Sequence, residues 1–511
     1  MAKILFSLGL NLVDPPSQLV ANEGGQIECS ILTNFKCIPK GIQKIGGFQA
    51  YNATSLGNKG IPWVERSYHL RGDNSIVTRL FGFYQGDIYY GDDVAGTLTK
   101  TNATGFRKEA IPLSESFQVS GNSILYVYTG VDTPMKYDGN GAFEWEKTGL
   151  DSDIIGGVTH LQRLWYWKTK SSNLSYSIPL FPETIDDEIL VGDNARDSFI
   201  KACIKIGNER FFVFKNNSIW ELFGRTSTQF YFRRVTGDYG LASKRALFPI
   251  GGGIIFQNEY DKELYFFGGT EASIKPLTED TIRLRDIMDL TQDSIDNATM
   301  TTHKGYFRFA FQHREDTAID ANGSELIYPI NDFRPDGLPK WSLIRGSNVS
   351  CYSRWTKYGD KNELVTGRSD MGKLMYHDRG KDWDGTQIET KVRTGDIIAS
   401  EDKRVEFKGF NISGKLGSHT LPITFRYYLD GRFPETAGVH GLIPEGETRT
   451  IGVVKLQQSS MFNDRIVPYV SYSRGMSIAF EFEDKNLGTD VELYSVAFTA
   501  QTRGKKRNQK V

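Results

Sequence analysis

LQRLWYWKTKSSNLSYSI, residues 161–178, shows how this chain is built. Side chains alternate along the first half of the stretch, so a strand there places Trp165 and Trp167 on one side and Leu164 and Tyr166 on the other. Large apolar residues on both sides are typical of a strand packed between two sheets. We therefore expect a buried strand of a hairpin, and not an exposed platform for stacking nucleic-acid bases.

Comparable hairpin-like stretches recur roughly every 35 to 50 residues, a period typical of β-propellers. Their turns carry residues that tolerate a positive φ angle, which tight hairpins need. Examples of such turns are Gln85-Gly86-Asp87, Asn216-Asn217 and Asp370-Met371-Gly372. The repeated stretches lie at 75–100, 121–147, 161–178, 208–224, 252–269, 303–313 and 362–378.

A repeat of several strands per unit predicts a β-propeller over residues 56–382, with six or seven divergent blades. Closing the blades into a ring leaves no long sheet edge exposed. The alternative is a large β-sandwich or two stacked barrels.

One segment, residues 278–290, has acidic residues in its first turn and apolar spacing typical of a helix. We therefore expect a short helix there, capped by Thr278 and inserted between blades.

The two ends of the chain differ from the repeats. Residues 1–55 contain consecutive prolines and read as a loop-like, extended N-terminal arm. Residues 383–502 form a run of long alternating strands, which predicts a second all-β domain, an antiparallel β-sandwich. Residues 503–511 form a basic tail, which is usually solvated and only sometimes contacts an anionic partner such as DNA. The candidate contact residues there are Arg503, Lys505, Lys506, Arg507 and Lys510.

Composition excludes several classes of protein. The chain has 511 residues, and 61 Lys and Arg against 62 Asp and Glu leave a net charge of −1, so there is no global attraction to nucleic acid or an anionic membrane. With 39% hydrophobic residues it can bury real cores. No run of 18 apolar residues and no signal-peptide pattern is present, so we expect no membrane span and no secretion. Four scattered cysteines do not make a disulfide framework.

No motif in the sequence carries catalytic chemistry. Histidines never stand at metal-ligand spacing, there is no Gly-x-Ser-x-Gly elbow, and the glycines at 251–253 precede a strand instead of a helix. Glycoside hydrolysis needs only two facing carboxylates, for which Asp261, Glu263, Asp92 and Asp93 are candidates. They occupy turn-like positions where acids are ordinarily solvated. We therefore expect no catalytic residue, no cofactor, no bound metal and no enzyme.

Short motifs follow one another in order over the whole chain. They are Gly9-Leu10-Asn11, Asp14-Pro15, Glu23-Gly24, KGIQKIGGF (40–48), TPMKYDG (133–139) with Trp145, Arg163-Leu164-Trp165, NSIWEL (217–222) and FRYYLDGRFPE (425–435). Taken together and in this order, they resemble the tail hub, or nozzle, proteins of short-tailed bacteriophages.

The resemblance implies a virion structural protein, synthesised and assembled in the host cytoplasm and carried in the tail. It implies a ring of six copies below the portal and adaptor that retains packaged DNA and forms the channel for genome ejection. The implied partners are further copies of the chain, the portal-adaptor complex, tail fibres or a needle or plug, and double-stranded DNA passing through the channel. The alternative is a tail-associated propeller enzyme or a receptor- or glycan-binding module.

Overall fold

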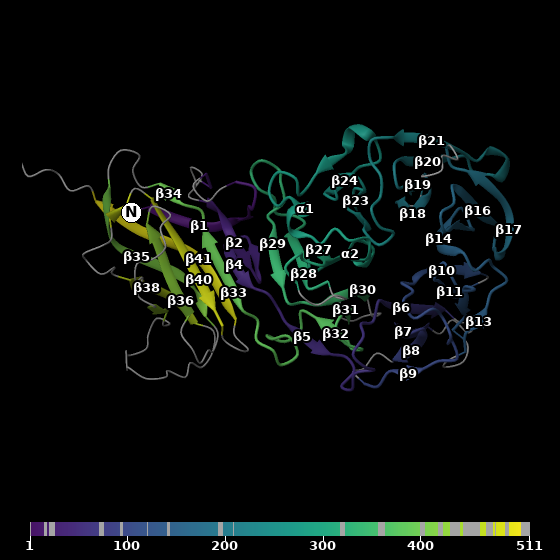
Figure 1. The fold of residues 1–511 in the computed structure, drawn as a ribbon, viewed down its shortest axis with the longest axis horizontal. Coiled ribbons are helices and arrows are strands. Elements are labelled where there is room, and N and C mark those ends of the chain that lie inside the picture. The colour runs from purple at the N-terminus through teal and green to yellow at the C-terminus, as the bar shows by residue number, and fades with distance from the viewer. Residues whose placement is uncertain are drawn as a thin grey trace, which may run out of the picture.

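The protein is described from a computed structural model. The described residues are 2–14, 18–19, 26–70, 76–91, 96–119, 121–139, 144–192, 198–207, 209–316, 322–355, 363–398, 404–416, 423–429, 440–442, 460–466, 474–475, 477–485 and 490–501. Strands dominate this part of the chain. Figure 1 shows a ring of small sheets on the right and a second group of long strands on the left. We call the strands within residues 48–377 the ring, and the strands within residues 2–44 and 390–501 the sheet unit.

Six separate four-stranded sheets form blades of the ring. The first three contain β6 (Trp63–Leu70), β7 (Ile76–Tyr84), β8 (Asp87–Gly91) and β9 (Thr99–Lys100); β10 (Leu113–Val119), β11 (Asn122–Tyr128), β12 (Met135–Tyr137) and β13 (Glu146–Lys147); and β14 (Ile154–His160), β15 (Arg163–Lys168), β16 (Asn173–Ile178) and β17 (Phe181–Leu190). The others contain β18 (Ile200–Ile206), β19 (Arg210–Lys215), β20 (Ile219–Phe223) and β21 (Tyr231–Thr236); β22 (Leu247–Ile250), β23 (Gly253–Gln257), β24 (Leu264–Phe267) and β25 (Lys275–Pro276); and β30 (Val349–Trp355), β31 (Glu363–Arg368), β32 (Leu374–His377) and β5 (Phe48–Ala50).

A further four-stranded meander completes the ring. It consists of β26 (Thr299–His303), β27 (Tyr306–Phe311), β28 (Ser324–Pro329) and β29 (Ser342–Arg345). The first strand of each sheet contacts the first strand of the next, in the order β6, β10, β14, β18, β22, β26 and β30, and β30 contacts β6 again. The predicted β-propeller architecture is therefore confirmed, with six free-standing blades and the meander between two of them.

Blades pack through both faces of their strands. In β15, Trp165 lies 5.4 Å from the ring of Phe211 in the next blade, while Tyr166 lies 6.2 Å from Tyr128 in the preceding blade. Trp165 and Tyr166 are fully buried. Aromatic pairs of this kind add about 0.5–1.5 kcal/mol each beyond the burial of apolar area. The two-sided burial predicted for residues 164–167 is confirmed, and it holds this blade between its neighbours.

The ring is closed by a strand from early in the chain. β5 pairs antiparallel with β32, where Phe48 lies opposite His377 and Ala50 opposite Met375. Three strands of this blade thus come from residues after 348 and the fourth from residues before 51. Because the first and last parts of the ring are hydrogen-bonded to each other, the ring has no open seam at this blade.

The sheet unit combines strands from both ends of the chain. Its strands are β1 (Ala2–Leu10), β2 (Gln26–Thr33), β3 (Phe35–Ile38), β4 (Gly41–Lys44), β33 (Thr390–Thr394), β34 (Ile397–Ile398), β35 (Val405–Leu416), β36 (Ile423–Leu429), β37 (His440–Leu442), β38 (Ser460–Ile466), β39 (Arg474–Gly475), β40 (Ser477–Asp484) and β41 (Val491–Gln501). With β26 to β29 they make one hydrogen-bonded system that closes as a barrel. The antiparallel sandwich expected for residues 383–502 is not confirmed, because β1 pairs parallel with β2 and all these strands connect.

Residues 1–55 do not form the extended arm that we expected. β1 pairs with β41, β2 with β33, and β4 with β41, so this segment supplies strands to the sheet unit before β5 closes the ring. The consecutive prolines that suggested an arm lie outside the described residues. β1 also pairs with β2 and β3 with β4, but the partners β33 and β41 lie more than 350 residues away, so no local pattern could reveal those pairings.

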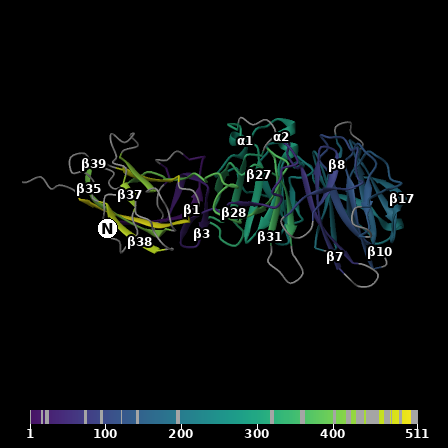
Figure 2. The same cartoon turned by 90° about the horizontal axis from the view of Figure 1, so that it is seen from below.

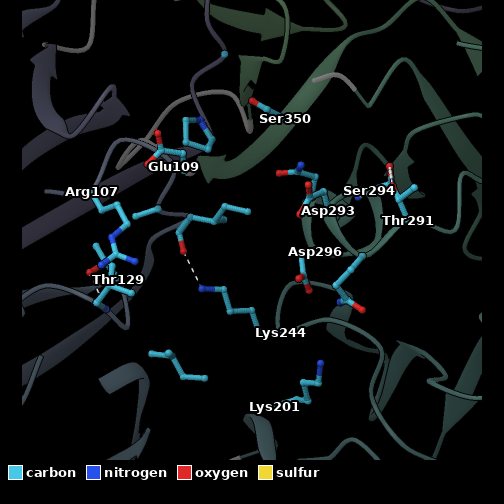
Figure 3. A pocket seen from close by; sticks show the side chains of 18 of the residues that line it. Arg107, Glu109, Thr129, Lys201, Lys244, Thr291, Asp293, Ser294, Asp296 and Ser350 are labelled. Carbon is cyan, nitrogen blue, oxygen red and sulfur yellow. Dashed lines mark hydrogen bonds between the residues drawn. The ribbon is translucent and has the colours of Figure 1, made fainter. Parts of the chain in front are cut away.

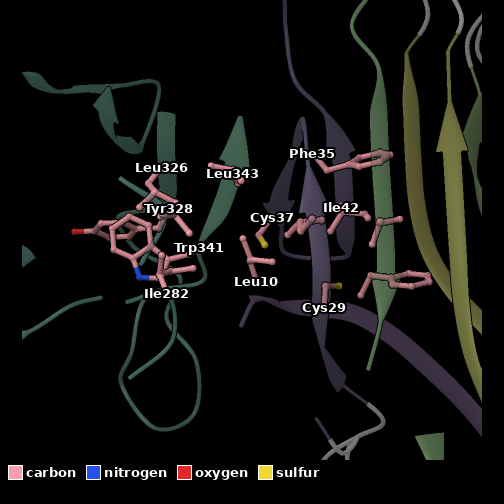
Figure 4. Packing of buried hydrophobic residues seen from close by; sticks show 14 of the residues in the cluster. Leu10, Cys29, Phe35, Cys37, Ile42, Ile282, Leu326, Tyr328, Trp341 and Leu343 are labelled. Carbon is pink, nitrogen blue, oxygen red and sulfur yellow. The ribbon is translucent and has the colours of Figure 1, made fainter. Parts of the chain in front are cut away.

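One hydrophobic core runs through the junction of the ring and the sheet unit. Figure 4 shows Trp341 and Tyr328 of the meander side packed towards Leu10, Cys37 and Ile42 of the sheet unit. Trp341 is fully buried and donates its indole N–H to the carbonyl oxygen of Leu277. Because this core is shared, the two parts of the molecule are packed together instead of being joined by a free linker.

The helical insertion is shorter and later than predicted. Two helices precede β26: α1 (Leu284–Ile287) and α2 (Gln292–Asn297). Thr278 caps neither, because its hydroxyl donates to the Glu263 carboxylate, and Thr291 caps α2 instead.

Among the three predicted turns, the one at Gln85-Gly86 has positive φ angles, of 51° and 85°, whereas those at Asn216-Asn217 and Asp370-Met371-Gly372 do not.

Candidate functional site

A cavity opens at the centre of one face of the ring, and we call it the mouth. Its volume is about 1320 Å³. Every sheet of the ring contributes the residues just before or at the start of its first strand, together with the turn between its second and third strands. In Figure 2, α2 lies on the upper face of the ring. The mouth therefore belongs to the whole ring and to the insertion that carries α2.

Basic side chains predominate in the part of the mouth formed by the consecutive blades from β6 to β25, where Glu109 and Glu259 are the acidic lining residues. The ammonium group of Lys244, just before β22, donates to the carbonyl oxygen of Ile111 at 2.8 Å (Figure 3). Burial and the neighbouring Arg245 guanidinium lower the pKa of Lys244 to about 8. Lys201 donates to the carbonyl oxygen of Ala242 at 3.4 Å. Both ammonium groups thus meet carbonyl oxygens and no carboxylate within ion-pair distance among the described residues.

Acidic side chains line the part of the mouth around α2. Asp289 accepts hydrogen bonds from the backbone N–H of Thr291 and from the hydroxyl of Ser294, at 3.1 and 2.7 Å, which hold the start of α2 in place. These bonds lower the pKa of Asp289. Asp293 and Asp296, one turn further on, also line the mouth, with their carboxylates on the side of α2 (Figure 3). The mouth therefore has a basic side and an acidic side.

Carboxylates continue along the first strands of the blades beyond the mouth. The hydroxyl of Ser114 on β10 donates to Glu65 on β6 at 2.9 Å, and it accepts from the indole N–H of Trp63 at 3.2 Å. Glu115 on β10 accepts from the backbone N–H of Thr159 on β14 at 2.8 Å. Burial raises the pKa of Glu65 to about 7. These bonds connect three successive blades, so the carboxylates act first as links in the ring.

A second charged cluster is buried between the meander and the blade that β5 closes. Arg308 on β27 donates to both carboxylate oxygens of Asp378, at 3.1 and 2.9 Å. Its guanidinium also lies 3.6 Å from Glu325, which accepts from the hydroxyl of Tyr352 and lies 3.4 Å from His377. Burial alone would raise the pKa of Glu325, but His377 and Arg308 hold it below the ordinary value. The cluster does not line the mouth and joins two sheets of the ring.

The residues singled out from the sequence take other positions. Arg503, Lys505, Lys506, Arg507 and Lys510 lie outside the described residues, as do Asp92 and Asp93.

Asp261 and Glu263 have hydrogen-bond partners within the molecule. Asp261 accepts from the hydroxyl of Tyr265 at 2.6 Å. Glu263 is buried and accepts from the hydroxyl of Thr278 at 2.6 Å and the backbone N–H of Leu284 at 2.8 Å, so it anchors α1. Neither residue lines the mouth.

Sequence reasoning missed the residues of the mouth. Lys201, Lys244 and Asp296 come from different parts of the chain, and only ring closure brings them together. The one available signal was the insertion expected between blades, because an insertion in a propeller changes one face of the ring. In the described part of the chain, no three His, Cys, Asp or Glu side chains gather as a metal site would require. The two α-helices described there have four and six residues, too few to span a membrane.

No protein-family model matches the chain, and no curated protein matches it at a significant level. Solved structures with similar folds include the extracellular domain of a putative one-component system from B. thetaiotaomicron. The alignment covers 64% of this chain and 39% of that chain, at 10% identity and a TM-score of 0.41. BBS1N, solved in complex with ARL6DN, matches over 64% of this chain and 98% of its own, at 12% identity and a TM-score of 0.36.

PorZ, a bacterial surface component of the type-IX secretion system of Porphyromonas gingivalis, matches over 64% of this chain and 37% of its own. Its identity to this chain is 10% and its TM-score is 0.37. This chain therefore spans well under half the length of the B. thetaiotaomicron and P. gingivalis proteins.

Proposed function

We propose that this chain is a tail hub, or nozzle, subunit of a short-tailed bacteriophage, a virion structural protein that assembles as a ring of six copies. In this role it retains packaged DNA and forms the channel through which the genome leaves. Its partners are further copies of the chain, the portal-adaptor complex above it, and fibres, a needle or a plug below it. The channel is built between copies, and the propeller of each copy is part of its wall.

The observation that carries the proposal is where the motifs of the resemblance lie. KGIQKIGGF covers β4 and the connection that leads from the sheet unit into the ring. Gly47 in this motif lies so close to the chain at Asp382 that a Cβ atom on it would be 1.9 Å from the Asp382 carbonyl oxygen. A motif fixed by such a contact is needed by the two-part architecture itself.

The other motifs have similar structural roles. Gly9 has a φ of +86°, and a Cβ atom there would lie 2.9 Å from the backbone of Trp341 in the shared core. The side chain of Asn11 is buried and donates to Glu28 of β2 at 3.0 Å. Trp145, just before β13, is buried against the preceding blade, 5.0 Å from the ring of Phe81 on β7. A shared order of such motifs is what a shared architecture would require.

Assembly is the property that tests the proposal. Size-exclusion chromatography with light scattering is run on the full chain, alone and with purified portal-adaptor complex. We expect a ring, or a subunit of 57.6 kDa that joins a ring when the adaptor complex is present. A chain that stays monomeric under both conditions overturns the proposal. If that monomer binds or depolymerises a surface polysaccharide, the alternative of a propeller enzyme or receptor-binding module is supported instead.

A further inference from the structure

The mouth of the ring has opposite charges on opposite sides. Arg107, Glu109 and the ammonium group of Lys244 lie on one side of the view in Figure 3, and Asp293 lies on the other with Thr291 and Ser294. The blades from β6 to β25 are basic on balance, because they line the mouth with six basic residues against Glu109 and Glu259: Lys59, Arg107, Lys108, Lys170, Lys201 and Lys244. An occupant that carries one sign of charge would be attracted by one side and repelled by the other.

Three amines of the basic side have no ion-pair partner. No carboxylate lies within ion-pair distance of Lys170, Lys201 or Lys244 among the described residues, and Arg245 adds a further positive charge beside Lys244. Burial without an anionic partner disfavours the charged form of an amine, which is why the pKa of Lys244 falls. An anionic group placed here would reverse that effect.

The acidic side also has unused charge. The carboxylate of Asp289 is occupied by Thr291 and Ser294. Asp293 and Asp296 have no hydrogen-bond or ion-pair partner within the described ranges, although Asp296 is close enough to Lys244 to favour its charged form. A cationic group is therefore the complement that this side of the mouth lacks.

The size of the mouth argues against a small ligand. Pockets for drug-sized molecules enclose about 300–1,000 Å³, and the mouth exceeds that range. A nucleic acid would place phosphates against Asp293 and Asp296, which repel them. A neutral glycan would leave the charges of both sides without partners.

We propose that the mouth binds a polypeptide segment of a partner protein, and that this segment carries both an acidic and a basic side chain. An acidic side chain of the segment lies against Lys244 and Lys201, and a basic side chain lies against Asp293 and Asp296. The proposal does not depend on the virion role, because a single copy of the chain contains the whole mouth.

A displayed library of random linear peptides, selected on the immobilised full chain, tests the proposal. We expect the recovered peptides to contain an acidic and a basic residue in the same segment. A synthetic copy of the strongest peptide is then titrated by fluorescence anisotropy. Its affinity should fall about tenfold or more in Lys244→Gln and in Asp296→Asn, as for other charge-assisted contacts, and it should weaken with salt.

Matched control variants separate binding from folding. Lys275→Gln and Asp280→Asn remove one charge each at exposed positions outside the mouth, and they should leave the affinity unchanged. Asp293→Asn, at an exposed position of α2, provides a second mouth variant if Lys244→Gln does not fold. Recovery of no peptide, of peptides without paired charges, or of peptides whose affinity is equal in Lys244→Gln and the controls would overturn the proposal. So would a DNA duplex or a neutral polysaccharide whose binding is lost in the mouth variants.

Discussion

The ammonium group of Lys44 on β4 lies 2.8 Å from a carboxylate oxygen of Asp484 on β40, and each side chain is only 1% exposed. The pair joins residues that are separated by 440 positions in the sequence. Charges removed from water to this extent are retained only when they meet a partner. The contact therefore holds the segment that enters the ring against the last strands of the sheet unit.

Replacing Lys44 by Met should destabilise the protein by about 3–5 kcal/mol, because the Asp484 carboxylate would stay buried without its cation. The double variant Lys44→Met with Asp484→Leu should recover most of this loss, because no charge is then left alone in the core. Urea unfolding followed by tryptophan fluorescence measures both. A double variant as unstable as the single one would contradict this account of the pair.

Alanine at Gly47 should cost about 3 kcal/mol, the upper part of the usual range for overpacking, since the added Cβ atom would collide with the backbone of Asp382. The matched control is Gly149→Ala, because an added Cβ atom there meets no atom within 4 Å. Thermal unfolding of the two variants makes the comparison. Equal melting temperatures would show that the ring tolerates movement of this connection.

The stability of the ring should depend on pH through Glu65. Burial raises its pKa to about 7 in the folded protein, above the ordinary value of 4.5. Between these pH values the folded state binds more protons than the unfolded state. The contribution of Glu65 to the free energy of unfolding is therefore fully present below pH 4.5 and is lost as the pH rises through 7. In Glu65→Gln this loss should be absent. Urea unfolding at pH 5 and pH 8 compares the free energies of unfolding of the variant and the parent protein. The variant should gain stability relative to the parent at pH 8, and an equal difference at both pH values would contradict this role of Glu65.

The four cysteines should be unreactive in the native protein. All of them are buried with free thiols, and burial raises the pKa of Cys37 to about 11 and that of Cys29 well above its ordinary value. The thiolate is the reactive form, so little of it is available. A thiol reagent should react with no cysteine in buffer at pH 8 and with all four in guanidinium chloride. Rapid reaction in buffer would mean that the core around Cys29 and Cys37 opens readily.

The propeller could be predicted because its evidence is local. Alternation in β15 and turn residues such as Gln85-Gly86 lie within single hairpins, and the recurrence of hairpins gives the ring. Other turns were invisible: Leu161 and Gln162 have φ angles of 51° and 60°, although neither residue type favours that region. There, pairing of the flanking strands determines the turn.

The sheet unit and the mouth could not be predicted for the opposite reason. β1 and β2 pair with each other, but their remaining partners, β41 and β33, come from the other end of the chain, and no local sequence pattern indicates those pairings. The charges of the mouth are single residues on separate blades, such as Lys201 and Asp296. Nothing in the sequence indicates which solvated charges the closure of the ring turns inwards.

The connection at Gly47 has a consequence for how such a molecule can change over time. The chain leaves the sheet unit after β4 and returns to it before β33, and the two crossings lie side by side, with the Phe48 N–H bonded to the Asp382 carbonyl oxygen at 2.8 Å. The ring is thus a cassette with two adjacent junctions. Recombination at those junctions could replace the ring by one with a different mouth and leave the sheet unit unchanged. The replacement ring would need a meander that can share the core with the sheet unit.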